Sequence, residues 1–279
     1  MKKICILVAL MFIFGSLAGC GEKPPETTEP VSDPGTSSSA GDAGAASVIV
    51  DDFTVQCIDG SLFTLSEALK DHEMVLINLF GTFCPPCEME FPAMQEAWQQ
   101  SADKIGVVAL SVDPDDTDEI LLEYAQKLGI TFPVGHEPGL GLRERFVTGY
   151  PTSILVDRNR RVASVEMGAK TSSQEFLDWF DGYTGDRYDP AVCTYTVNCY
   201  GSENYEDIAN VTVNFCTDNA CFPVTSNDKG VAVFTGPPAE YHVQIAGVPD
   251  GWQADGETDW YTELYSQTFY VAFSQTEQP

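Results

Sequence analysis

Two cysteines separated by two residues, Cys84 and Cys87, are the residues in this sequence best suited to chemistry. They follow the apolar run Met74–Phe80, which has the composition of a strand buried on both faces. A C-x-x-C sequence at a strand-to-helix junction places Cys84 at the helix N-terminus and Cys87 one turn inside. The free N–H groups and the positive end of the helix dipole favour a thiolate there, so we expect a lowered pKa for Cys84.

This spacing suits thiol–disulfide exchange. Cys84 can attack a disulfide, and Cys87 lies close enough to resolve the mixed disulfide that forms. Pro85 stiffens the entry to the helix, and Pro86 fits its first turn, where no N–H group is needed. A structural zinc site or a static disulfide would use the same cysteines, but zinc needs a second ligand pair that the neighbouring sequence does not supply. We therefore expect no metal, and no cofactor beyond a redox-active disulfide.

The elements that must position this dithiol lie between residues 48 and 186, where apolar runs alternate with helical patterns. Ile105–Val112 is a second buried run, and residues 116–128 show the apolar spacing of a helix. Residues 153–156 and 161–165 resemble a hairpin, and a last helix is expected over residues 172–180. Cys57 is expected in an N-terminal strand as a buried free thiol. Strand–helix alternation closed by an antiparallel hairpin predicts a mixed α/β sheet flanked by helices.

The segment from Val75 to Cys87, continued by Glu90-Phe91-Pro92, resembles the TlpA/ResA-type thiol–disulfide oxidoreductases. These are membrane-tethered members of the thioredoxin superfamily. The resemblance extends over the region 48–186 and implies a thioredoxin-like fold. It also implies that Cys84 attacks and Cys87 resolves.

The same resemblance indicates where a substrate would bind. Gly149-Tyr150-Pro151-Thr152 matches the family's cis-proline loop, which faces the C-x-x-C sequence and holds substrate backbone by strand-like hydrogen bonds. Phe83 stands where the family usually has tryptophan; it keeps an aromatic shield and loses an N–H donor. With Pro85, these residues are the expected substrate contacts.

Two supporting residues follow from the resemblance as well. Asn78 stands where thioredoxin itself has a buried acid. Glu90, three residues after Cys87, matches an acidic residue that would tune the cysteine pKa or relay protons. A solvated helix carboxylate is the alternative interpretation of Glu90.

A peroxiredoxin is the nearest enzymatic alternative on this fold. Its peroxidatic cysteine follows a P-x-x-x-T-x-x-C pattern. Here Thr82 stands only two residues before Cys84, so the register fails and peroxide reduction is at most secondary.

The N-terminus has the features of an export signal. Lys2 and Lys3 precede the apolar stretch Ile4–Leu17, and Leu17-Ala18-Gly19-Cys20 resembles the lipobox of bacterial lipoproteins. The resemblance implies a signal peptide over residues 1–19 and lipidation of Cys20; an ordinary secretory signal is the alternative. Residues 20–47 are rich in Pro, Ser, Thr, Gly and Ala, which is typical of a flexible linker. We expect the protein on the extracytoplasmic face of the bacterial cell membrane.

Residues 187–279 show short alternating strands, which predict a second domain, an all-β sandwich. Val211, Val213 and Phe215 share one face, as do Val231 and Val233, and then Tyr241, Val243 and Ile245. Residues 227–230 (Asn-Asp-Lys-Gly) carry a hairpin turn signal. The runs 228–234, 237–243 and 248–252 resemble the prealbumin-like surface domains of Gram-positive bacteria.

Four cysteines fall in this second domain. Cys216 and Cys221 could face each other across a hairpin within disulfide reach, and we expect a structural disulfide between them. On one straight strand Cys193 and Cys199 would lie about 20 Å apart, too far to bond. Either the chain turns between them or each has another partner.

Composition limits the classes of function. Fourteen Lys and Arg against 42 Asp and Glu give a net charge of −28, which repels nucleic-acid phosphates and excludes a nucleic-acid binder. Nine cysteines fit an oxidising compartment, and three histidines do not suit a histidine-rich metal centre.

The sequence therefore predicts a lipid-anchored thiol–disulfide oxidoreductase that reduces disulfides outside the cytoplasm. Electrons would come from a membrane thiol-transfer donor, because no nucleotide or flavin motif is present. Recipients would be disulfide-containing secreted or surface proteins, an apocytochrome or a methionine sulfoxide reductase. The alternatives are a surface-binding protein acting through its β-domain, an oxidant that forms disulfides, and a peroxiredoxin-like peroxidase.

Overall fold

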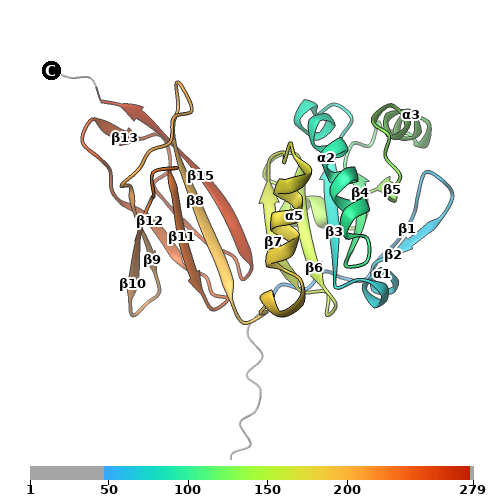
Figure 1. The fold of residues 1–279 in the computed structure, drawn as a ribbon, viewed down its shortest axis with the longest axis horizontal. Helices are drawn as coiled ribbons and strands as arrows, with labels where there is room; N and C mark the ends of the chain where they lie inside the picture. Colours follow the sequence, from blue (N-terminus) through green and yellow to red (C-terminus); the bar gives the residue numbers. More distant parts are fainter. Residues whose placement is uncertain (1–46, 277–279) are drawn as a thin grey trace, which may run out of the picture. The chain divides into compact units, whose positions relative to one another are not determined.

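The computed structural model describes residues 47–276, in which an α/β region precedes a region rich in β-strands (Figure 1). The first region contains β1 (Thr54–Gln56), β2 (Leu62–Thr64), α1 (Leu65–Asp71), β3 (Met74–Phe80), α2 (Pro85–Ser101), β4 (Ile105–Ser111), α3 (Asp118–Leu128), β5 (Val134–His136), α4 (Leu142–Phe146), β6 (Thr152–Asp157), β7 (Val162–Met167), α5 (Ser173–Gly182) and the 3₁₀ turn η1 (Gly185–Arg187). The second contains β8 (Cys193–Gly201), β9 (Thr212–Cys216), β10 (Cys221–Thr225), β11 (Val231–Gly236), β12 (His242–Gly247), β13 (Trp252–Ala254), β14 (Asp259–Tyr261) and β15 (Ser266–Gln275).

Strand β3 is the centre of the α/β region. It pairs in parallel with β4 and antiparallel with β6, and all seven of its residues are buried. Because side chains alternate across a strand, Leu76 and Phe80 enter the core on one face, and Ile77 and Leu79 enter the core on the other. This arrangement confirms the predicted mixed sheet with helices on both faces.

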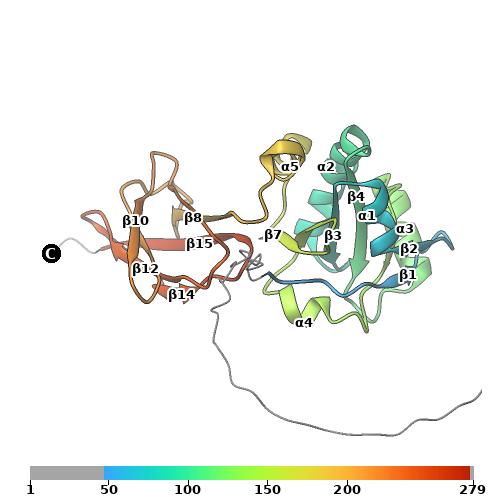
Figure 2. The ribbon, with the colours of Figure 1, turned by 90° about the horizontal axis from the view of Figure 1, so that it is seen from below.

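Different helices supply those two cores. Helices α2, α3 and α5 contribute Phe91, Tyr124 and Phe176 to the first, whereas α1 and α4 contribute Leu65 and Phe146 to the second. Figure 2 shows α2 and α5 on one side of the sheet and α4 on the other. The fold is thioredoxin-like, as the sequence predicts.

Local sequence fixes where several of these elements begin. Helix α3 starts after Thr117, whose hydroxyl accepts from the backbone N–H of Ile120, and ends at Gly129, whose φ of 68° suits glycine. The predicted hairpin is present as the antiparallel pair β6–β7. Cys57 is a buried free thiol, but it lies just after β1, which ends at Gln56, and not within the strand.

The β-rich region consists of strands from two sheets. One sheet has the order β10-β9-β12-β14; β11, β8 and β15 belong to the sheet that also contains β7 and β3. Val211, Val213 and Phe215 all point into the core, as their spacing predicts. On β11 the pattern is different, since the buried residue is Ala232 and the side chain of Val233 is 47% exposed.

The turn at residues 227–230 does not close a hairpin, so that prediction was wrong. It joins β10 to β11, but β10 pairs with β9 and β11 pairs with β8. The turn itself is tight: Gly230 has a φ of 70°, and a Cβ there would lie 2.3 Å from the carbonyl oxygen of Cys199. The four residues specify a turn, whereas the partner of each strand depends on where its apolar face is buried.

The cysteines of this region fall into two kinds. Cys216 and Cys221 lie directly opposite each other on β9 and β10 and form a disulfide, with their Cα atoms 4.0 Å apart. Cys193 and Cys199 both lie on β8 with their side chains on the same buried face, and both are free thiols. The chain therefore does not turn between Cys193 and Cys199, and within residues 47–276 neither has a disulfide partner.

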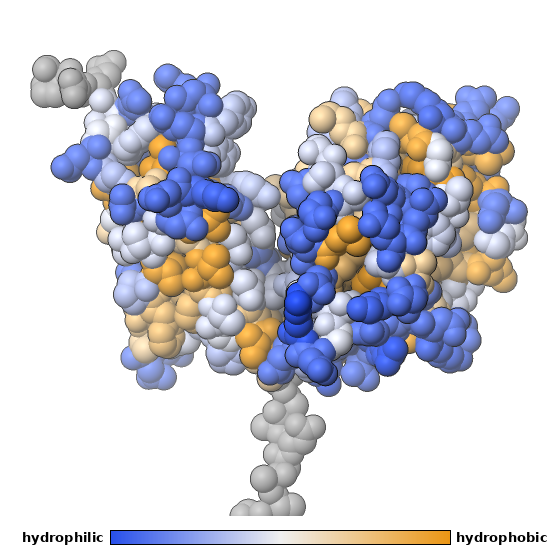
Figure 3. Space-filling view, in the orientation of Figure 1, coloured by the Kyte–Doolittle hydropathy of each residue, from blue (hydrophilic) through white to orange (hydrophobic). Residues whose placement is uncertain are grey.

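The predictions of a signal peptide at residues 1–19, a lipidated Cys20 and a linker over residues 20–47 lie outside the described residues, apart from the last linker position. Within residues 47–276, no helix combines the length and apolar character needed to cross a membrane. Hydrophilic residues cover most of the α/β face visible in Figure 3, in keeping with the excess of acidic side chains.

Candidate active site: the Cys84–Cys87 disulfide

Cys84 and Cys87 form a disulfide at the start of α2, and their Cα atoms are 5.3 Å apart. Cys84 is the N-cap residue, with an extended backbone, and its sulfur accepts a hydrogen bond from the backbone N–H of Cys87 at 3.2 Å. Pro85 occupies the first helical position, where its fixed φ suits the helix. Cys84 is 5% exposed and Cys87 is fully buried, so of the two residues only Cys84 has surface that an incoming group can reach.

The loop at residues 149–151 leads into β6 beside the dithiol. Leu79 on β3 pairs with Thr152 on β6, which brings this loop to the same end of the sheet as the disulfide. The Tyr150–Pro151 peptide bond is cis, and the Thr152 hydroxyl donates to the carbonyl of Gly149 at 2.7 Å.

Aromatic side chains from two elements meet at this loop. The ring of Phe83 packs edge-on against Tyr150, with centroids 5.8 Å apart, and Phe83 is 58% exposed. Pro85 is also exposed at the start of α2. Of the predicted substrate contacts, Phe83 and Pro85 therefore leave surface open to a partner, Tyr150 is half-buried, and Pro151 and Thr152 are buried.

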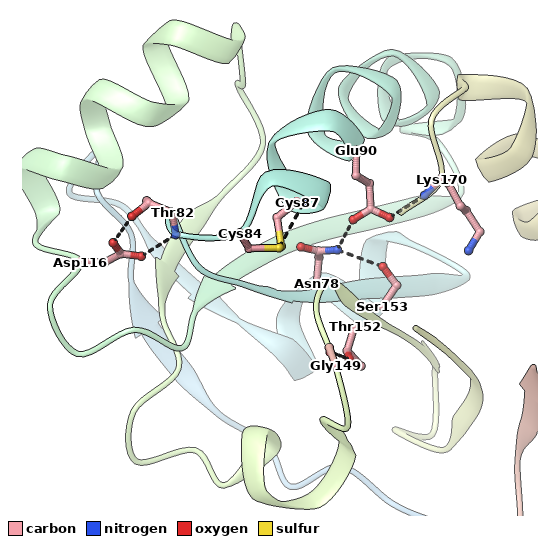
Figure 4. Close-up of a disulfide and its surroundings, with 10 residues drawn as sticks. All are labelled: Asn78, Thr82, Cys84, Cys87, Glu90, Asp116, Gly149, Thr152, Ser153 and Lys170. Atoms are coloured by element: carbon pink, nitrogen blue, oxygen red, sulfur yellow. Dashed lines mark hydrogen bonds between the residues drawn. A yellow bond between two sulfur atoms is a disulfide. The ribbon is translucent and has the colours of Figure 1, made fainter. Parts of the chain in front are cut away.

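Glu90 lies one turn after Cys87 on α2 and points toward the sheet (Figure 4). Its carboxylate accepts from the Asn78 amide at 2.9 Å and from the backbone N–H of Lys170 at 3.3 Å. The Asn78 amide also donates to the Ser153 hydroxyl at 3.0 Å. Glu90 is fully buried, so the interpretation as a solvated helix carboxylate was wrong.

Burial sets the acid–base behaviour of Glu90. Desolvation raises the pKa of Glu90 to about 7, and the hydrogen bonds from the Lys170 backbone and Asn78 oppose that rise. A carboxyl group with this pKa exchanges its proton readily near neutral pH. Behind the dithiol the structure thus places a group able to accept or supply a proton.

Lys170 is a site residue that the sequence analysis missed. Its ammonium group pairs with Glu166 and lies 4.4 Å from the centroid of the Trp179 ring. Its backbone N–H donates a hydrogen bond to Glu90, which lies 80 positions away in the sequence, and no local pattern predicts that contact.

Asp116 is the second missed residue. One carboxylate oxygen accepts from the backbone N–H of Thr82 at 3.1 Å and the other accepts from the Thr82 hydroxyl. The Ser111 hydroxyl donates to the same carboxylate, which is 5% exposed. Acids before a helix are explained by the helix alone, so the sequence carried no signal for this contact.

The arrangement supports exchange between one reachable and one buried sulfur, with a proton-exchanging carboxyl group behind the second. Within residues 47–276, no cluster of three or more His, Cys, Asp or Glu side chains is placed to hold a metal ion.

Comparison with known proteins identifies the family. The AhpC/TSA family model matches residues 48–165, a range that includes the dithiol and the cis-proline loop. The thiol–disulfide oxidoreductase ResA of Bacillus thuringiensis (strain Al Hakam) is 32% identical over 123 residues, covering 44% of this chain and 69% of that protein. The chain belongs to the ResA-type thiol–disulfide oxidoreductases. The predicted enzyme class is confirmed.

Other ResA-type and thioredoxin-like proteins are similar over the same share of the chain. The thioredoxin-like protein YneN of Bacillus subtilis (strain 168) is 27% identical over 124 residues, which cover 44% of this chain and 72% of YneN. A thiol:disulfide interchange protein of the thioredoxin family from Chlorobium tepidum TLS superposes with a TM-score of 0.43 and 26% identity, covering 49% of this chain and 95% of that one.

Proposed function

We propose that this ResA-type protein is a membrane-anchored, extracytoplasmic reductase of protein disulfides. The Cys84 thiolate attacks one sulfur of the partner's disulfide, which forms a mixed disulfide and releases one partner thiolate. The Cys87 thiolate then attacks the Cys84 sulfur, which releases the second partner thiolate and closes the Cys84–Cys87 disulfide. Two electrons thus pass from the dithiol to the partner, whose disulfide is reduced.

One observation carries this proposal: the unequal access of the two sulfurs. Cys84 caps the helix beside the exposed Phe83 and the cis-proline loop, whereas Cys87 is fully buried beneath it. A partner sulfur can therefore meet Cys84 and no other atom of the pair. Cys87 is held back for the second, intramolecular step.

Glu90 has the role of proton acceptor in that second step. Cys87 must lose its proton before it attacks, and it is enclosed by protein, so water cannot take the proton directly. The carboxyl group of Glu90, one turn along α2 and with its pKa raised to about 7 by burial, suits this transfer.

Tyr150, Pro151 and Thr152 hold the partner's chain beside Cys84 by strand-like hydrogen bonds. Phe83 and Pro85 supply exposed apolar contact at the same place. Such a surface recognises the backbone around a disulfide more than particular side chains, which suits several different protein substrates.

The lipobox resemblance at Cys20 supports an anchor on the extracytoplasmic face of the membrane, with residues 20–47 as the linker. Electrons would then arrive from a membrane thiol-transfer protein. The recipients would be disulfide-bonded secreted or surface proteins, an apocytochrome or a methionine sulfoxide reductase. Replacement of Cys20 by Ala should move the protein from the membrane fraction to the soluble fraction of the cell.

Trapping tests the order of the two cysteines. The full-length Cys87→Ser variant should accumulate a mixed disulfide through Cys84, whereas Cys84→Ser should form none and should lose disulfide reduction. The Cys216→Ser/Cys221→Ser variant is the matched control, because it removes the other disulfide and should keep the activity. Full reduction activity in Cys84→Ser would refute the mechanism.

The reduction potential of the Cys84–Cys87 pair tests the direction of electron flow. A value near that of thioredoxin, about −270 mV, supports a reductase. A value near that of DsbA, about −120 mV, would make the protein an oxidant and reverse the proposed flow.

A further inference from the structure

The carboxylate of Asp116 has no part in the mechanism above, although it lies against the loop that presents Cys84. It accepts three hydrogen bonds: two from Thr82, through its backbone N–H and its hydroxyl, and one from the Ser111 hydroxyl. Thr82 belongs to the short segment between β3 and α2, two residues before Cys84. Asp116 lies in the loop between β4 and α3, so the contact joins two loops at the same end of the sheet.

In the part of the chain that the structure describes, no ion pair neutralises this carboxylate. Among the ion pairs within residues 47–276, none includes Asp116. Asp116 directly precedes Thr117, the N-cap of α3, where the helix dipole favours negative charge. The three donors and the helix end stabilise the buried carboxylate, and its negative charge is not cancelled by a neighbouring Lys or Arg.

A compact turn connects Thr82, which binds the carboxylate, to Cys84. The backbone N–H of Cys84 donates to the carbonyl of Gly81 at 3.1 Å, which folds the chain between them. Figure 4 shows Asp116 with Thr82 on one side of the disulfide and Glu90 with Lys170 on the other. Each cysteine therefore has a buried carboxyl group on its own side, Asp116 near Cys84 and Glu90 near Cys87.

We propose that Asp116 is a positioning residue that holds the Gly81–Cys84 turn and keeps a negative charge beside Cys84, which makes the dithiol a stronger reductant. The proposal deepens the function proposed above and rests on it. The reduction potential of the dithiol would then depend on a residue outside the C-x-x-C sequence as well as on Pro85 and Pro86.

The sign follows from the charge of the reduced state. The N-terminus of α2 stabilises a Cys84 thiolate, and a neighbouring carboxylate opposes that stabilisation. The carboxylate therefore makes the reduced protein less stable, relative to the disulfide form, than it would be with the helix N-terminus alone. A less stable reduced form passes its electrons on more readily, so the reduction potential falls.

Other charged groups share this environment and must be kept constant in a test. Helix α2 carries Glu88, which pairs with Lys127 of α3, and Glu90. Tyr124 of α3 has its pKa raised by burial first, and then by the charges of Glu88, Asp116 and Glu90. These groups surround the dithiol from both helices, so only a change that leaves them in place isolates Asp116.

The test compares full-length Asp116→Asn with Asp113→Asn. Asparagine can still accept from the Thr82 N–H and hydrogen-bond its hydroxyl, so the turn is kept while the charge is lost. Asp113 lies in the same loop, half-buried, and its replacement removes the same charge three residues away. The readouts are the pKa of the reduced Cys84 thiol, from the pH dependence of its alkylation, and the equilibrium constant with glutathione.

Asp116→Asn should lower the Cys84 pKa by about one unit, the size expected for one nearby charge at partial burial. The equilibrium with glutathione should shift about tenfold toward reduced protein, equivalent to about 30 mV for a two-electron couple. Asp113→Asn should leave both quantities within about twofold of wild type, since this charge is partly exposed to solvent, makes no hydrogen bond to Thr82 and is screened. Asp116→Glu, which keeps the charge, should restore most of the wild-type values.

Equal shifts in Asp116→Asn and Asp113→Asn, or a higher Cys84 pKa in Asp116→Asn, would overturn the proposal. Should Asp116→Asn not fold, Thr82→Val provides the second variant. It removes one donor but keeps the charge, so exchange should slow while the Cys84 pKa stays at the wild-type value; a fall of about one unit would refute the assigned role of the charge. Failure of the proposed function looks different, because wild type itself would then show no reversible dithiol couple.

Discussion

At the scale of single residues, Glu90 shows how position alone changes the chemistry of a side chain. Its spacing of three residues from Cys87 puts both on the sheet-facing side of α2, where Glu90 is enclosed completely. An exposed glutamate on the same helix, Glu96, has no such environment. Burial rather than residue type makes Glu90 suitable for proton exchange near neutral pH.

The raised pKa of Glu90 predicts a pH-dependent cost in stability. The folded pKa is about 7 and the ordinary value is 4.5, so the folded protein binds this proton more tightly than the unfolded chain. Its contribution to stability is therefore full below about pH 4.5 and is lost as pH rises through 7. Between pH 5 and pH 8, the free energy of unfolding of Glu90→Gln should rise by about 2.5 kcal/mol relative to that of wild type.

Urea unfolding of both proteins at the two pH values measures this change. Glu96→Gln is the control on the same helix, because it removes an exposed carboxyl group instead of a buried one. A Glu90→Gln effect that is the same at pH 5 and pH 8 would mean that the carboxyl group stays ionised in the folded protein at both.

At the scale of elements, α5 forms the outer support of the Glu90 side of the site. Its N-terminus has a capping box, in which the Ser172 hydroxyl accepts from the backbone N–H of Glu175 and the Glu175 carboxylate accepts from that of Ser172. Phe176 and Trp179 of the helix then pack into the core that also contains the dithiol. The cap holds the helix start next to Lys170, whose backbone N–H binds Glu90.

Removal of this cap should weaken the folded state without touching the dithiol. Ser172→Ala should lower the free energy of unfolding by about 1 kcal/mol, the usual cost of an N-cap loss. Ser173→Ala, at the next position, keeps the capping box and should change stability by less than about 0.5 kcal/mol. Chemical denaturation distinguishes the two, and equal losses would show that the capping box contributes nothing specific.

At the scale of the whole molecule, the reactivity of the free thiols measures how often the two hydrophobic cores open to solvent. Cys57, Cys193 and Cys199 are buried in the α/β core and in the β-rich core. Burial raises the pKa of all three thiols, that of Cys199 to about 11. The thiolate, which is the reactive form, is therefore scarce at each position.

We expect these three thiols to resist iodoacetamide in the folded, oxidised protein. Labelling at pH 8 should be more than about a hundredfold slower than in denaturant, because it requires local or global opening. Mass spectrometry of the labelled peptides gives the rate at each position. Fast labelling of Cys193 and Cys199 in native buffer would mean that β8 opens without unfolding of the whole chain.

Much of the candidate site was predictable because its determinants are local. The apolar run of β3, the C-x-x-C sequence after it and the start of α2 at Pro85 follow one another in the chain, and each is set by its own few residues. The family resemblance added the loop at Pro151 and the importance of Glu90.

Only the tertiary structure decided which distant residues meet. Asp116 reaches Thr82 across 34 positions, and the backbone of Lys170 reaches Glu90 across 80. Likewise the sequence predicted the turn at residues 227–230, but it did not predict that the two strands on either side of the turn enter different sheets. Periodicity tells which face of an element is buried, but not which element covers it; that choice depends on packing of the whole chain, which no local pattern records.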